Sequence, residues 1–100
     1  MDMPVALSEL QLQIVLDVLS RVVPQREVWA FGSRATFNAK PFSDLDLAVM
    51  GEWPLTLSQM AELAEAFSNS DLPFKVDVVD WATCSEPFRQ IINDHHVVLV

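Results

Sequence analysis

The sequence predicts an α/β (α+β) domain in which helices flank a small mixed sheet of three to four strands. Two observations support this class. Segments with apolar residues at helical spacing alternate with short β-rich segments, and the connections between them are short. The chain has 100 residues, of which 51% are hydrophobic and 20% charged, as in ordinary globular domains. We therefore expect a single domain over residues 1–100.

The first third of the chain is predicted to form a helix and then a strand. The helix covers residues 8–22, where a capping box of Ser8 and Gln11 precedes an apolar stripe that ends before a proline. Residues 27–31 are aromatic and β-rich and stop at a glycine, which indicates a strand. The elements expected next are a short helix over residues 33–37 and a loop over residues 38–43.

The rest of the chain continues this alternation. A strand is expected at residues 44–50, followed by a helix over residues 56–67 that begins with a second capping box, Thr56 and Gln59. The last predicted elements are a strand at residues 74–79, a short helix over residues 85–93, and a final strand or docked tail at residues 97–100.

The overall charge argues against direct binding of nucleic acid. Fourteen acidic and six basic residues give a formal net charge of −8, which repels phosphate backbones. Cys84 is the only cysteine, so no intrachain disulfide can form. We expect no signal peptide in the N-terminal segment, no membrane-spanning segment, and a cytoplasmic location.

Three aspartates suggest a metal site. In the predicted strand at residues 44–50, alternation places Asp44 and Asp46 on one face and Leu45 on the other. Asp77 lies within a second apolar strand and would join the pair if the two strands are neighbours. Three carboxylates at one place form an oxygen-only site suited to Mg²⁺, with room for two ions. The alternative is that Asp44 and Asp46 only solvate the outer face of a half-buried strand.

A possible phosphate-binding turn precedes these carboxylates. Gly32 and Ser33 lie where a strand ends and a helix is expected to begin, so their backbone N–H groups can hold phosphate oxygens. The Ser33 hydroxyl adds a donor, and Arg34 could reach a terminal phosphate as a planar donor fork. Ten residues separate Ser33 from Asp44, which gives the pattern G-S-x10-D-x-D.

This pattern resembles the signature of the nucleotidyltransferase superfamily of DNA polymerase β. More narrowly, two segments look like those of the minimal nucleotidyltransferases, stand-alone domains of about this length: FGSRATFNAKPFSDLDLAV and KVDVVD. The resemblance is close from Trp29 to Asp80. It implies a polymerase-β-like fold and an enzyme that transfers nucleotides.

The family resemblance also implies a partner and a reaction. Minimal nucleotidyltransferases are commonly antitoxins that transfer AMP from ATP to a tyrosine of a HEPN ribonuclease toxin and thereby neutralise it, so we expect a hetero-oligomer. By the same resemblance, Gly32 and Ser33 would hold the triphosphate with help from Arg34. The carboxylates Asp44 and Asp46 would hold Mg²⁺, and the third, Asp77, would hold the catalytic ion and help deprotonate the acceptor hydroxyl.

Three further positions bear on the nucleotide. Relatives often have a glycine shortly after the Arg-Ala pair, where this chain has Thr36-Phe37-Asn38. Lys40 is a candidate for added positive charge near the phosphates, against the simpler reading of a solvated loop lysine. Trp53 is a candidate for stacking on adenine or on a partner.

Two other functions remain open from the sequence. The acceptor could be a small molecule, as in the aminoglycoside nucleotidyltransferases, with a partner subunit supplying the helical domain that this chain lacks. Alternatively, the protein could be a non-catalytic antitoxin that neutralises its partner by binding. Against the second reading, all the key residues of the pattern are present together.

Overall fold

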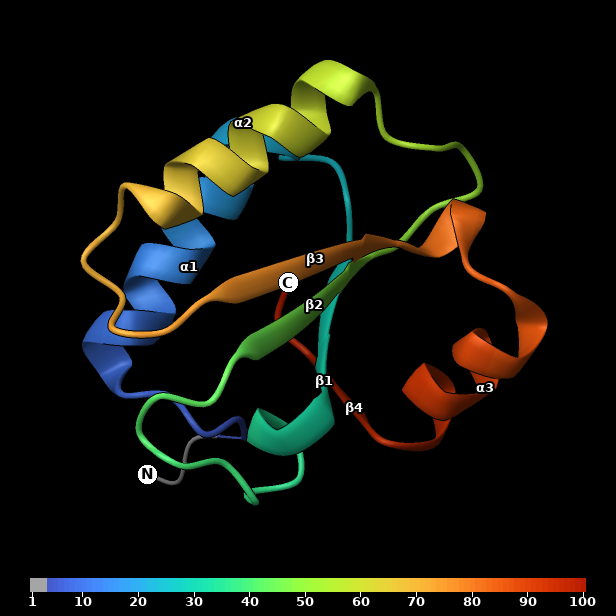
Figure 1. The fold of residues 1–100 in the computed structure, drawn as a ribbon. Coiled ribbons are helices and arrows are strands. Elements are labelled where there is room, and N and C mark those ends of the chain that lie inside the picture. The colour runs from blue at the N-terminus through green and yellow to red at the C-terminus, as the bar shows by residue number, and fades with distance from the viewer. Residues whose placement is uncertain (1–3) are drawn as a thin grey trace.

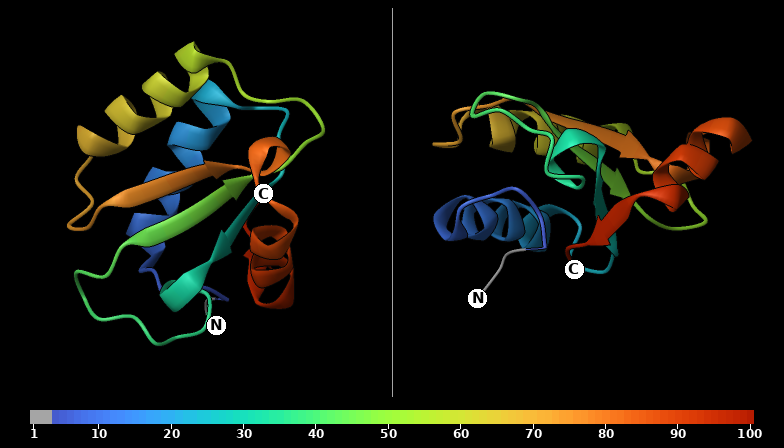
Figure 2. Two further views of the ribbon diagram at one scale, coloured as in Figure 1. Left: turned by 45° about the vertical axis from the view of Figure 1, so that its right-hand side comes forward. Right: turned by 90° about the horizontal axis from the view of Figure 1, so that it is seen from below.

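The fold is a four-stranded mixed sheet with helices on both faces, as the sequence predicts (Figures 1 and 2). The computed structural model describes residues 4–100. Residues 1–3, which belong to the N-terminal segment where no signal peptide is expected, lie outside the described residues. The elements in chain order are α1 Glu9–Val22, β1 Val28–Phe31, the 3-10 turn η1 Gly32–Arg34, β2 Leu45–Val49, α2 Leu57–Ser68, β3 Val76–Asp80, the 3-10 turn η2 Trp81–Thr83, α3 Glu86–Asp94 and β4 His96–Val98.

The strands lie in the order β3-β2-β1-β4. β1 is antiparallel to both β2 and β4, whereas β2 and β3 are parallel. The parallel pair needs a crossover connection, which α2 supplies. β4 confirms that the C-terminal segment is a strand, because it pairs with β1 along the edge of the sheet.

The two faces of the sheet are packed differently. α1 and α2 cover one face (Figure 2). The side chains of Leu45, Leu47 and Val49 are fully buried in the main core. Because side chains alternate along a strand, Ala48 faces the other way and packs with Ile92 of α3 in a second, smaller cluster. The site described below lies on this second face.

The helices begin as predicted. Both capping boxes are formed: the Ser8 and Thr56 hydroxyls accept hydrogen bonds from the backbone N–H groups of Gln11 and Gln59, whose side chains bond back. The three α-helices of residues 4–100 have 14, 12 and 9 residues. None of them is long and apolar enough to span a bilayer, which needs roughly 20 apolar residues.

The predicted short helix at residues 33–37 is not an α-helix in the structure, whereas the other predicted elements differ only at their ends. It is a single 3-10 turn, η1, after which Phe37 adopts a left-handed φ of 59° and Asn38 N–H donates to the Ser33 carbonyl at 2.9 Å. A left-handed residue cannot continue a helix, so the segment turns back toward β2. The second 3-10 turn, η2, was not anticipated from the sequence; the Asp80 carboxylate caps it.

Candidate active site

The strand register brings two of the predicted site residues opposite each other. β2 and β3 are neighbours, and Asp46 pairs with Asp77 across them. Asp46 also pairs with Phe31, the last residue of β1, on its other side. Asp44 is exposed and comes just before β2 begins, two positions ahead of Asp46. The predicted carboxylates therefore lie at the end of the sheet where β1 delivers the glycine turn.

Gly32 is held against the Asp46 carboxylate. Its φ is +74°, in the left-handed region that favours glycine. A Cβ atom added at this position would collide with Asp46 Oδ2. The absence of a Cβ atom at Gly32 thus has two effects: it permits the left-handed turn, and it lets the backbone of η1 approach the carboxylate. The predicted phosphate-binding turn and the predicted metal site are consequently parts of one site.

The carboxylates repel one another. Burial raises the pKa of Asp46, and the nearby charges of Asp77 and Asp44 raise it further. Lys75 offsets part of this charge, since its Nζ lies 3.4 Å from Asp77 Oδ1, but both side chains are substantially exposed and their pairing is weak. The three aspartates therefore concentrate negative charge, and the exposed Lys75 ammonium group offsets only part of it.

This arrangement fits Mg²⁺. Carboxylate oxygens are the ligands that Mg²⁺ prefers, and a divalent cation would offset both the burial of the Asp46 charge and the repulsion from Asp77 and Asp44, which together raise the pKa of Asp46. Over residues 4–100, no three His, Cys, Asp or Glu side chains are already gathered at metal-binding distance. Asp44 is exposed and Asp77 is half-exposed, whereas the backbone of Asp46 is held between Phe31 and Asp77 in the sheet.

Arg34 does not have the role expected from the sequence. Its guanidinium is buried, with the residue only 5% exposed, and it faces the protein interior. Nε and Nη2 donate to the Ser43 carbonyl at 3.0 and 2.9 Å, Nη2 also donates to the Pro41 carbonyl at 3.1 Å, and Nη1 donates to the Ala6 carbonyl at 2.6 Å. The expected contact with a terminal phosphate is corrected accordingly, because these carbonyls occupy the donor fork.

The position of Arg34 instead ties the segments of the site together. It belongs to η1 with Gly32 and Ser33, and it binds the carbonyl of Ser43, next to Asp44. Its guanidinium carbon lies 3.9 Å from the centroid of the Phe74 ring, just before the strand that carries the third aspartate. Burial lowers the pKa of Arg34 from its usual value, but guanidinium groups remain charged in proteins.

Sequence reasoning missed Lys75. It lies just before β3 and two positions ahead of Asp77, so the alternation of extended chain places the two side chains on one face, and this signal was available in the sequence. The side chains of Lys40 and Trp53 are exposed, and Trp53 lies beyond the far end of β2 from the carboxylates. The turn before Trp53 is held by Arg26, which donates to its carbonyl at 2.7 Å.

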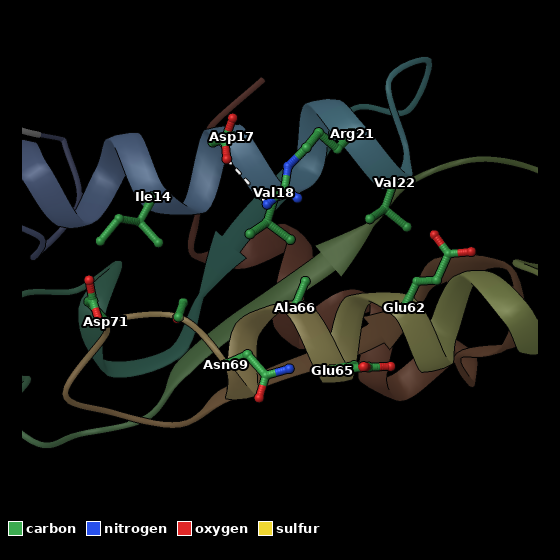
Figure 3. A pocket seen from close by; sticks show the side chains of 11 residues that line it. Ile14, Asp17, Val18, Arg21, Val22, Glu62, Glu65, Ala66, Asn69 and Asp71 are labelled. Atoms are coloured by element: carbon green, nitrogen blue, oxygen red, sulfur yellow. Dashed lines mark ion pairs between the residues drawn. The ribbon is translucent and has the colours of Figure 1, made fainter.

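A pocket of about 620 Å³ between α1 and α2 is a poor alternative site for a nucleotide (Figure 3). It lies on the sheet face away from Asp46. Four of its lining residues are acidic, and its one basic residue, Arg21, already pairs with Asp17 at 3.2 Å. Its field would repel a triphosphate.

A glycine turn placed against paired strand carboxylates is the arrangement of an enzyme that acts on nucleotide phosphates. The chain belongs to the polymerase β nucleotidyltransferase family, whose model matches residues 13–100. It is 53% identical over 89 residues to a Haemophilus influenzae protein described as "Probable protein adenylyltransferase MntA", a match that covers 89% of this chain and 78% of that relative.

Solved structures agree with this assignment. A crystal structure of a toxin–antitoxin with AMP-PNP is 26% identical, with a TM-score of 0.76, and the match covers 89% of this chain and 72% of that chain. A tri-AMPylated Shewanella oneidensis HEPN toxin in complex with MNT antitoxin gives 26% identity and a TM-score of 0.70 over 92% of this chain and 71% of that chain. The predicted polymerase-β-like fold and the resemblance to minimal nucleotidyltransferases are both confirmed.

Replacing Gly32 should move the glycine turn away from the Asp46 carboxylate. In Gly32→Ala the new methyl group strains the backbone and pushes the Asp46 carboxylate aside, so we expect nucleotidyl transfer to fall about 100-fold. Gly51→Ala is the matched control: Gly51 has a φ of +142° and an added Cβ would meet Arg26, beyond the other end of β2. It should lose stability without losing activity. Equal transfer rates in the two variants would contradict the role assigned to Gly32.

Neutralising Asp46 should stabilise the fold. Because its pKa is raised in the folded chain, ionised Asp46 destabilises that chain at neutral pH, and the penalty disappears as the pH falls through the raised pKa. Asp46→Asn should therefore have a higher free energy of unfolding than the parent at neutral pH, with the difference shrinking in acid. Urea titrations of both proteins at neutral and at acidic pH measure these free energies of unfolding.

Asp17→Asn is the control for that comparison, because it removes an exposed ion pair with Arg21 instead of a repulsion. It should leave stability unchanged or slightly lower. Mg²⁺ should raise the unfolding midpoint of the parent and not that of Asp46→Asn. An Asp46→Asn variant less stable than the parent at neutral pH would refute the electrostatic account.

Removing the Arg34 guanidinium should affect both stability and activity. Arg34→Met leaves carbonyl oxygens of the loop without their donors, at a cost of about 1–3 kcal/mol in the free energy of unfolding. Nucleotidyl transfer should fall as well, because the segment before Asp44 loses its anchor. Arg21→Met, which removes an arginine from an exposed ion pair, should change neither quantity measurably. Full activity in folded Arg34→Met would contradict this assignment.

Proposed function

We propose that this protein is a Mg²⁺-dependent adenylyltransferase antitoxin that transfers AMP from ATP to a tyrosine hydroxyl of a partner HEPN ribonuclease toxin and thereby neutralises it. The observation that carries the proposal is the pairing of Asp46 with Asp77 while Gly32 packs against the Asp46 carboxylate. This one contact joins a turn able to hold phosphates to a carboxylate group able to hold metal ions.

The relatives support the substrate and the partner. The H. influenzae relative is described as a protein adenylyltransferase, and one similar structure contains AMP-PNP, an ATP analogue. Another similar structure pairs an MNT antitoxin with an AMPylated HEPN toxin. The net charge of −8 also suits a basic, RNA-cutting partner better than a nucleic-acid substrate. Use of ATP as donor fits a cytoplasmic location.

Each site residue then has a task. Gly32 and Ser33 hold the triphosphate, and the three aspartates hold two Mg²⁺ ions. When bound, these ions supply positive charge to the phosphate oxygens. The acceptor oxygen attacks the α-phosphorus, the bond from that phosphorus to the oxygen bridging to the β-phosphate breaks, and pyrophosphate leaves. Asp77 takes part in removing the proton of the acceptor hydroxyl, and Asp46 is held fixed by its strand partners.

The first experiment labels the acceptor. Purified protein, Mg²⁺ and ATP labelled on the α-phosphate are added to a lysate of the native host, and a labelled protein band is expected whose mass identifies the partner. Substitution of a site carboxylate, as in Asp44→Asn, Asp46→Asn or Asp77→Asn, should reduce labelling at least about 100-fold, because charge compensation is lost. Asp71→Asn is the control, since Asp71 is exposed and lines the pocket between α1 and α2.

Other outcomes would replace the proposal. Label found only in a small-molecule fraction would indicate an aminoglycoside-like acceptor. The absence of any transfer, together with a tightly co-purifying partner, would indicate an antitoxin that acts by binding. Full labelling with Asp46→Asn would refute the metal site itself. Digestion of the labelled band and mass spectrometry of its peptides would show whether the modified residue is a tyrosine.

A further inference from the structure

Two exposed aromatic side chains lie beside the site on the loop between η1 and β2. Phe37 is 61% exposed and Phe42 is 74% exposed. Both belong to the ten-residue segment that separates Ser33 from Asp44. An exposed phenyl ring contributes little to folding, and both of these rings lie on the segment that leads to the carboxylates.

The backbone at Phe37 is in a conformation that disfavours phenylalanine. Its φ of 59° lies in the left-handed region, where the Cβ atom crowds the following carbonyl and where glycine or asparagine is more stable. A bulky residue kept in this conformation, with its ring in solvent, raises the free energy of the folded chain. Strain of this kind is concentrated at functional positions.

Hydrogen bonds hold the backbone on which these rings are mounted. Arg34 donates to the carbonyls of Pro41 and Ser43, on either side of Phe42, and Ser43 N–H donates to the Lys40 carbonyl at 3.0 Å. On the other side of the loop, the Asn38 N–H bond to Ser33 closes the turn that contains Phe37. A surface fixed in advance loses little conformational entropy when a partner binds.

We propose that Phe37 and Phe42 form the contact surface for the acceptor protein, a basic protein segment that carries the hydroxyl to be modified. The inference rests on the proposed function. The loop leads directly into Asp44, so a segment that reaches the carboxylates passes beside it. The phenyl rings offer apolar area and, for arginine or lysine side chains, cation–π contacts, while the net charge of −8 attracts a basic chain.

The test separates acceptor binding from nucleotide binding. Phe37→Asn keeps a residue that tolerates the left-handed φ, and Phe42→Ser removes the second ring. In the double variant, the KM for the purified acceptor protein, identified by its α-phosphate label, should rise at least tenfold. The kcat at saturating acceptor and the affinity for AMP-PNP with Mg²⁺ should stay within twofold of the parent.

The matched control is the double variant Leu10→Ser/Leu57→Ser. These leucines are 70% and 91% exposed on α1 and α2, on the sheet face away from the carboxylates. Their loss should leave the KM for the acceptor unchanged. As a second readout, Phe37→Asn alone should unfold at a midpoint no lower than that of the parent, because the ring is exposed and the strain is relieved.

Several results would overturn the inference. An unchanged KM in the aromatic variant, an equal rise in the leucine control, or a weakened affinity for AMP-PNP would each do so, and the last would assign the rings to the nucleotide. A lower midpoint for Phe37→Asn would give the ring a structural role instead. Failure of the proposed function is distinguishable, because the parent protein itself would then label no protein, and the inference would fall with it.

Discussion

One buried guanidinium connects the segments at the end of the sheet that carries the candidate site. Arg34 leaves the glycine turn, fixes the carbonyls that precede Asp44, reaches the N-terminal segment at Ala6 and lies on the ring of Phe74 before β3. Each partner belongs to a segment that is distant from the others along the chain. Hydrogen bonds from a charged donor are roughly twice as strong as neutral ones, and burial removes the competition of water. This one side chain links the glycine turn to the segment before Asp44, whereas strand pairing places Asp46 and Asp77.

These contacts of Arg34 matter because the arrangement of the carboxylates and the glycine turn raises the free energy of the folded chain. Burial of the Asp46 carboxylate raises its pKa, the charges of Asp77 and Asp44 raise it further, and Gly32 is folded tightly against this carboxylate. The opposite face of the same strands offsets this cost. Leu45 and Leu47 are fully buried against α1 and α2, and each contributes roughly 1.5–3 kcal/mol by leaving water. One strand therefore stabilises the fold with one face and carries the strained site on the other.

The sequence predicts those features that depend on local periodicity. Both capping boxes and the alternation of Asp46 with buried leucines follow from neighbours a few residues apart, and all are present in the structure. The role of Arg34 could not be derived in this way, because an arginine after a glycine turn suits a phosphate as well as a set of carbonyls. The choice depends on the path of the loop, which brings the carbonyls of Pro41 and Ser43 back to the guanidinium. The left-handed φ of Phe37 was equally hidden, since the residue type argues against it.

The spacing of ten residues between Ser33 and Asp44 has a structural meaning. β1 and β2 are antiparallel neighbours, and Phe31 pairs with Asp46, so a tight hairpin turn of two residues could have joined them. Such a turn would have no room for η1, for the carbonyls that Arg34 binds or for exposed aromatic rings. The long connection replaces a hairpin turn with a loop that begins at the predicted phosphate-binding turn and ends at the first predicted metal ligand, Asp44. The same stretch of chain can therefore set the geometry of the reaction and present a surface to the molecule that is modified.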